Sequence, residues 1–113
     1  PQDGPEQLGA QVQKNGWQFP YLLDHDQKLV KALKAACTPD FFLFSPSKDG
    51  KQKLNYRGQL DSSRPGNNTE PNGCDLRDAM DALLSGQEVN PIQNPSIGCN
   101  IKWHPGEEPS WFS

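Results

Sequence analysis

The chain has 113 residues, of which 33% are hydrophobic, and this length allows one domain at most. Its formal net charge is −3 and it has no run of basic residues, which argues against binding to nucleic acid or to an anionic membrane surface. The 11 prolines and 10 glycines concentrate outside the apolar segments, so we expect a small core with long polar connections.

No apolar stretch approaches the roughly 20 residues that a membrane-spanning helix needs, so no membrane span is expected. The first residues, Pro1 to Gly4, lack the basic and apolar regions of a signal peptide. They also lack an initiator methionine, which suggests a processed or excised start.

The first third of the chain predicts a helix, a short strand and a second helix. A helix is expected over residues 3–16, because Asp3 is a plausible N-cap and Gly16 suits a C-terminal stop. Residues 19–23 are apolar enough for a short strand or a buried extended segment. Over residues 24–37 apolar side chains recur at the period of a helix, with a capping-box pattern at the start.

The middle of the chain predicts a hairpin and a third helix. Residues 41–44 are Phe-Phe-Leu-Phe, a short run that favours a strand buried on both faces. Residues 54–58 alternate in polarity, and the two segments predict an antiparallel hairpin. Residues 75–85 predict a helix with a core-facing apolar stripe made of Leu76, Met80, Leu83 and Leu84.

The last segment carries four prolines and shows no periodicity. We therefore expect residues 1–86 to form the domain and residues 87–113 to form an extended tail that packs on it. The expected apolar anchors of this tail are Ile92, Ile97, Ile101, Trp103 and Trp111.

The predicted fold class is α/β, with too little sheet for an ordinary fold of that class. Only residues 21–44 form a strand–helix–strand unit, and the hairpin adds the only further strand. We expect a mixed sheet in which the strands at Tyr21 and Phe41 are parallel and the strand at Leu54 is antiparallel. The chain therefore looks as if strands were missing from its front.

Three cysteines, Cys37, Cys74 and Cys99, are widely spaced along the chain. Their odd number and long spacings fit neither a disulfide framework nor a zinc motif, so we expect no metal and no cofactor.

Three blocks of sequence carry a resemblance to a known family: residues 35–44 around Thr38-Pro39, residues 56–66, and residues 95–103. In this order they resemble the redoxin-domain, peroxiredoxin-like group of thioredoxin-fold proteins. The resemblance implies an incomplete thioredoxin-like fold, the C-terminal part of a thiol-disulfide oxidoreductase or peroxidase. The Cys-x-x-Cys motif that such proteins carry upstream is absent, because no two cysteines are three residues apart.

The resemblance assigns the substrate-binding wall of a redox site to Thr38 and Pro39. It implies a cis Thr38-Pro39 peptide bond and a Thr38 backbone offered to an extended substrate segment, as in strand addition. Without the resemblance, a trans proline that ends a helix is the ordinary interpretation.

Two cysteines are candidate catalytic thiols. Cys37 would serve as an auxiliary or resolving thiol, or it is simply a small buried side chain, as free cysteines often are. Cys99 is a candidate partner for Cys37, and a disulfide between them needs Cα atoms within about 7 Å. We expect no role for Cys74, and a structural clasp between Asp61 and Arg64.

Three functions are compatible with these features: a piece of a thiol-disulfide redox protein, inactive by itself; a non-catalytic redoxin-like binding or structural module; and a single-thiol redox sensor that uses Cys37 or Cys99. The expected partners are a protein or a small thiol or peroxide substrate. An exposed sheet edge also predicts an oligomer, or a sheet completed by another chain. The unpaired cysteines suggest a reducing cytoplasm.

Overall fold

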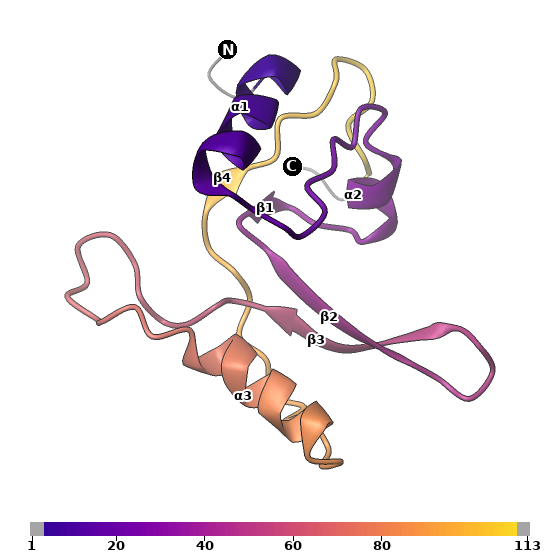
Figure 1. The fold of residues 1–113 in the computed structure, drawn as a ribbon, viewed down its shortest axis with the longest axis vertical. Coiled ribbons are helices and arrows are strands. Elements are labelled where there is room, and N and C mark those ends of the chain that lie inside the picture. The colour runs from indigo at the N-terminus through magenta and orange to yellow at the C-terminus, as the bar shows by residue number, and fades with distance from the viewer. Residues whose placement is uncertain (1–3, 111–113) are drawn as a thin grey trace. The chain divides into compact units, whose positions relative to one another are not determined.

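The computed structural model describes residues 4–110 and divides into two compact units, Pro1–Lys34 and Ala35–Ser113 (Figure 1). Within the described residues, no helix is both long and apolar enough to cross a membrane.

The first unit begins with helix α1, Pro5–Asn15, which confirms the first predicted helix. Gly16 ends it with a φ of 64°, a left-handed conformation that glycine adopts without steric cost. The backbone N–H groups of Gly16 and Trp17 then donate to carbonyls in the last turn of the helix, at 3.3 and 3.2 Å. Gly4 is the N-cap, and the predicted cap Asp3 lies outside the described residues.

The strand predicted at residues 19–23 is wrong, because this segment pairs with no other strand in the described chain. Its two aromatic residues contact Trp17, just before the segment, instead. The ring of Trp17 stacks on that of Phe19, with centroids 5.5 Å apart, and lies 5.3 Å from the ring of Tyr21. Pro20 within the segment also has no N–H to give to a sheet.

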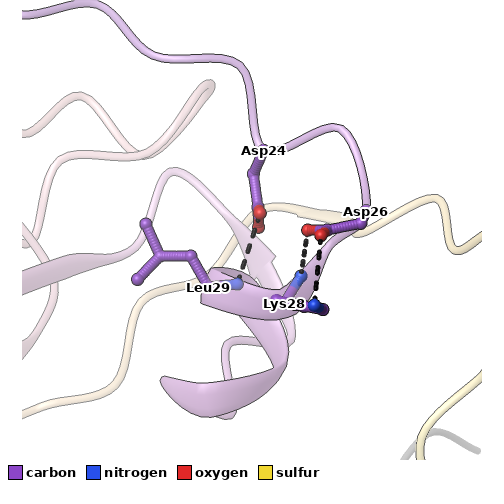
Figure 2. A network of polar contacts seen from close by, with 4 residues as sticks. All are labelled: Asp24, Asp26, Lys28 and Leu29. Atoms are coloured by element: carbon purple, nitrogen blue, oxygen red, sulfur yellow. Dashed lines mark hydrogen bonds and ion pairs between the residues drawn. The ribbon is translucent and has the colours of Figure 1, made fainter.

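Helix α2, Lys28–Ala32, is much shorter than the helix predicted over residues 24–37. The Asp24 carboxylate accepts the N–H group of Leu29 at 3.2 Å (Figure 2) and that of Val30 at 2.8 Å, so it does cap the first turn. Gln27, expected to lie inside this helix, is instead the boundary residue of α2, with a φ of 59°. Lys34, with a φ of 56°, prevents the helix from continuing to residue 37.

The second unit contains the predicted hairpin. Strands β2, Phe41–Pro46, and β3, Gln52–Gly58, pair antiparallel, with Phe41 opposite Gly58 and Leu43 opposite Tyr56. The strand at residues 41–44 is not buried on both faces as expected, and Phe44 is 41% exposed. In the described chain β3 is the only neighbour of β2, so no second strand covers its other edge.

Helix α3, Cys74–Leu84, confirms the third predicted helix and packs against β2 and β3 (Figure 1). The buried apolar residues of the second unit are few: Ala35, Tyr56 and Ala79. The predicted stripe is only partly buried, since Leu84 is 87% exposed. Ala79 is the buried residue of this helix.

A second sheet pairs β1, Cys37–Thr38, antiparallel with β4, Cys99–Asn100. Strand β4 was not expected in the tail, and the predicted parallel pairing is wrong, since both described sheets are antiparallel. The broad α/β class holds. Of the expected anchors, Ile92 and Ile97 are 78% and 69% exposed, whereas Ile101 and Trp103 are half-buried. Trp111 lies outside the described residues.

Candidate functional site

The Thr38-Pro39 turn lies at the junction of the two small sheets, between the end of β1 and the start of β2. Its peptide bond is cis, as the family resemblance implies. Both residues are exposed, whereas Ala35 just before β1 is only 5% exposed. The side chains of the turn are therefore exposed, whereas Ala35 before β1 is buried.

The backbone of Thr38 already pairs with the C-terminal tail. The register places Cys37 opposite Asn100 and Thr38 opposite Cys99, and the N–H of Ile101 donates to the carbonyl of Ala36 at 3.2 Å. In an antiparallel pair, hydrogen-bonded and non-hydrogen-bonded positions alternate. Thr38 and Cys99 are thus the next hydrogen-bonded pair, in which two opposed residues exchange N–H···O bonds.

The tail approaches this turn so closely that residue 98 has no room for a side chain. A Cβ built on Gly98 would overlap the carbonyl oxygen of Thr38. Next to it, the Thr38 hydroxyl donates to the Cys99 carbonyl at 3.5 Å. The close approach explains why glycine stands here, in the middle of the third block of the resemblance.

The two candidate thiols lie on opposite faces of the small sheet. Cys37 is opposite Asn100, so its side chain shares a face with that residue, and Cys99 shares the other face with Thr38. Both cysteines are free. The proposed Cys37–Cys99 disulfide is therefore not formed, and the register does not favour it.

Cys37 is half-buried, and its thiol donates to the carbonyl of Ser96 at 3.4 Å. Burial raises the pKa of this thiol, the Asp40 carboxylate raises it further, and Arg57 and Arg64 act in the opposite direction. A raised pKa leaves less thiolate near neutral pH, so Cys37 is a weak nucleophile there. Cys99, in contrast, is exposed.

Cys74, for which we expected no role, is also a free thiol. It donates to the carboxylate of the adjacent Asp75 at 3.2 Å, and this hydrogen bond, with burial second, raises its pKa. The raised pKa favours the protonated form of this thiol at the start of α3.

Two small pockets flank the turn. One, of about 200 Å³, has Pro39, Phe41 and Arg64 in its wall together with Ile97 of the tail. The other, of about 260 Å³, is lined by Cys37, Asp40 and Arg57, among others. The turn therefore separates an apolar and arginine-lined hollow from a thiol-lined one.

The loop that follows β3 forms the far wall of the Pro39 pocket, and Arg64 holds it in place. Its guanidinium donates to the carbonyls of Asp61 at 2.9 Å and Ser63 at 2.8 Å, and to the side-chain carbonyl of Gln59. The expected Asp61–Arg64 clasp is present, but it runs through the Asp61 backbone rather than its carboxylate.

The Asp61 carboxylate binds backbone instead. It accepts N–H groups from Gly73 at 2.6 Å, Asn72 at 2.9 Å and Ser63 at 3.0 Å. These hydrogen bonds, that of Gly73 foremost, lower the pKa of Asp61. The loop from residue 59 to α3 is therefore closed at both ends by side chains that bind its own backbone.

Buried polar contacts connect this loop to the core of the second unit. Tyr56 is 4% exposed, and its hydroxyl donates to the Gln59 carbonyl. The Gln59 side chain donates to Asp75 of α3 at 2.7 Å while it accepts from Arg64. Tyr56 and Gln59 were not expected to be site residues, although both belong to the second block of the resemblance.

The tail closes the outer edge of β3. The Gln93 side chain accepts from the N–H of Arg57 at 3.0 Å and donates to the carbonyl of Asn55 at 2.8 Å, as a strand would. Gln59 N–H donates to the Asn94 carbonyl at 2.9 Å, and the Ser96 hydroxyl donates to the Gly58 carbonyl at 2.7 Å. Polar groups therefore fix this part of the tail, where the expected anchors Ile92 and Ile97 are largely exposed.

A larger hollow of about 410 Å³ lies between α3, β3 and the tail, with Asp75, Asp78 and Glu88 in its wall. Nothing in the sequence pattern had indicated it. Within the described residues, no three His, Cys, Asp or Glu side chains form a group that could hold a metal ion.

The chain resembles solved structures whose names describe hypothetical or uncharacterized proteins. The chain is 50% identical to a hypothetical protein from Sinorhizobium meliloti, with a TM-score of 0.83, over 94% of this chain and 56% of that one. It is 49% identical to an uncharacterized conserved protein from Geobacillus kaustophilus, with the same TM-score, over 94% of this chain and 54% of that one. No family model and no curated protein matches. The chain thus spans a little more than half the length of these two solved structures.

Proposed function

We propose that this chain is part of a thioredoxin-like, peroxiredoxin-like thiol-disulfide redox protein, in which Thr38 and Pro39 form the substrate-binding wall. The observation that carries the proposal is the backbone of Thr38, which ends a strand beside a pocket and is opposed by an extended segment. An extended substrate needs such a strand end for main-chain pairing. The three sequence blocks of the resemblance converge on this place.

The chemistry would come from a Cys-x-x-Cys pair in the part of the protein outside this chain. The thiolate of one cysteine attacks a substrate disulfide, forms a mixed disulfide and releases one substrate thiolate. The second cysteine then attacks the mixed disulfide, releases the other substrate thiolate and leaves the pair oxidised. The role of Thr38 is to hold the substrate segment, and its backbone groups are the relevant ones.

The lengths of the two solved neighbours leave room for this arrangement, because about half of each lies outside the match. Cys37 and Cys99 suit different roles in such a protein. The raised pKa of Cys37 suits a protected thiol, whereas the exposed Cys99 is accessible to exchange. With all three cysteines free, we propose a reducing cytoplasm as the compartment.

A second candidate is a non-catalytic binding or structural module. The small number of buried apolar residues and the exposure of Phe44, Leu54 and Met80 favour a chain that another chain, or another part of the same protein, completes.

The test is to sequence the parent reading frame and to express it in full. We expect an upstream Cys-x-x-Cys and reduction of a disulfide-linked model peptide in the presence of a thiol reductant. Replacing Thr38→Val keeps the backbone N–H and should preserve the rate, whereas Thr38→Pro removes that N–H and should lower it by about tenfold or more. A complete frame without the cysteine pair would refute the redox proposal and leave the binding module.

A further inference from the structure

The tail segment of residues 98–101 uses the backbone groups of Thr38 that a substrate strand would need. The pairing is antiparallel, with Cys99 opposite Thr38. Pro39 has no N–H to donate to a neighbouring strand, so the backbone groups of Thr38 are the ones that can pair with a strand at this turn. An incoming segment that pairs in the same way must therefore displace the tail.

We propose that residues 98–101 occupy, in the folded chain, the strand-pairing site formed by the backbone of Thr38. After these residues are released, the site accepts an extended polypeptide that has glycine just before the residue opposite Thr38. The inference rests on the proposed function for its biological meaning, since it names the substrate class and the regulation of the same site. Its physical content is independent of any redox chemistry.

Few contacts hold residues 98–101 against Thr38, which makes their displacement feasible. The paired strand β4 has two residues, and the side chains of both are exposed. Further along, the indole N–H of Trp103 is buried without a hydrogen-bond partner. A buried unsatisfied donor opposes closure, because opening of the tail returns it to water.

The tail is anchored separately from the segment that would leave. Gln93 and Ser96 bind the backbone of β3 through their side chains. Residues 98–101 lie beyond these contacts and pair with β1 instead. Release of β4 therefore leaves the edge of β3 closed, and Ser96 marks the hinge.

The glycine requirement follows from the contact at residue 98. Any side chain there would overlap the Thr38 carbonyl oxygen, which is backbone and cannot move aside without breaking the pair. A partner segment in the same register meets the same carbonyl, so it needs glycine at that position. This selects polypeptide segments of the form Gly-x over other extended sequences.

Tethering sets how strongly the tail competes. A short linker holds a binding segment at an effective concentration of the order of millimolar. A free peptide must overcome that concentration on the intact chain, and it faces no such competition when the tail is released.

The experiment uses a fluorescent peptide with the sequence of residues 95–102, with serine in place of its cysteine, titrated with the 113-residue chain. The variants Gly98→Val and Cys99→Pro release the tail by a steric clash and by loss of an N–H, respectively. Gly9→Ala is the matched control, since a Cβ at Gly9 meets nothing within 4 Å. A second peptide carries valine at the position of Gly98.

We expect both release variants to bind the glycine peptide at least about tenfold more tightly than the wild type and Gly9→Ala, and to ignore the valine peptide. Equal binding by all four chains, or equal binding of the two peptides, would overturn the proposal. If circular dichroism shows that both release variants are unfolded, hydrogen exchange of the wild type decides. The amide of Cys99 must then exchange faster than the amides that pair β2 with β3, and equal protection would overturn the proposal. None of these outcomes depends on an upstream cysteine pair, so the redox proposal is tested separately.

Discussion

Removal of one hydroxyl group, by Tyr56→Phe, tests whether the polar contacts behind the Thr38-Pro39 turn stabilise this unit. Tyr56 is 4% exposed and lies in β3, where its hydroxyl donates to the carbonyl of Gln59. Gln59 is itself 7% exposed and joins Arg64 to Asp75. Phenylalanine keeps the ring and removes the donor.

The expected cost follows from the acceptor that is left behind. A buried carbonyl without its hydrogen bond costs about 1–3 kcal/mol, more than the net value of an ordinary hydrogen bond. Domains of this size have about 5–15 kcal/mol of stability, so the loss is a large part of the total. At roughly 4–8 °C per kcal/mol for a small domain, the melting temperature should fall by at least about 4 °C.

The assay is urea unfolding followed by far-ultraviolet circular dichroism, with the slope of the transition compared between variants. Tyr21→Phe is the matched control, because Tyr21 is the other tyrosine and is 42% exposed. We expect Tyr21→Phe to change the free energy of unfolding by less than about 0.5 kcal/mol. Equal effects of the two substitutions, with unchanged slopes, would refute the reasoning.

Three further predictions concern charge and thiol chemistry. Asp61→Asn should destabilise the chain above pH 4, where an unfolded aspartate, with a pKa of about 3.9, is ionised. Because folding lowers the pKa of Asp61, the stability that its carboxylate contributes is lost as the pH falls through the folded pKa. The urea midpoints of variant and wild type should therefore converge in acid. Iodoacetamide at neutral pH should modify the exposed Cys99 faster than Cys37, whose pKa is raised by burial and by Asp40; mass-spectrometric mapping checks this, and faster reaction at Cys37 would contradict it. Mild oxidation should not join Cys37 to Cys99 within one chain, because their side chains lie on opposite faces, and a mass loss for that peptide pair would contradict the register.

The elements that the sequence predicted well are those whose signals are local. The hairpin of β2 and β3 and helix α3 follow from period and turn residues within about a dozen positions. The helix expected over residues 24–37 was predicted too long, because the periodic spacing of apolar side chains does not report the left-handed backbone at Gln27 and Lys34. The strand expected at residues 19–23 failed because a strand needs a partner, and composition says nothing about one.

The candidate site divides in the same way. The resemblance located Thr38 and Pro39 and implied the cis bond, which the structure has. It did not indicate β4, since a two-residue strand paired across more than 60 positions leaves no local pattern. Gln93 and Ser96 were missed for a related reason, because a polar side chain that binds a strand edge looks like any other loop residue.

The two edges of the hairpin differ, and this difference predicts how the chain associates. Gln93 and its neighbours close the outer edge of β3, whereas β2 has β3 as its only partner in the described chain. An apolar strand with an open edge favours pairing with another strand, and charged side chains are what natural edge strands use to prevent it. Phe44 lies on this strand and is 41% exposed.

We therefore expect the isolated chain to self-associate, and Phe44→Lys to shift it toward the monomer in light scattering at equal concentration. Leu84→Lys is the control, because Leu84 is 87% exposed but is the last residue of α3 rather than part of β2. If general hydrophobic exposure drove association, Leu84→Lys would act at least as strongly as Phe44→Lys. A folded, monomeric wild type would show instead that an unpaired β2 is stable in water, and the reason for a completing strand would disappear. Association that only Phe44→Lys reduces locates the place where the rest of the protein, or a second copy, adds to the sheet.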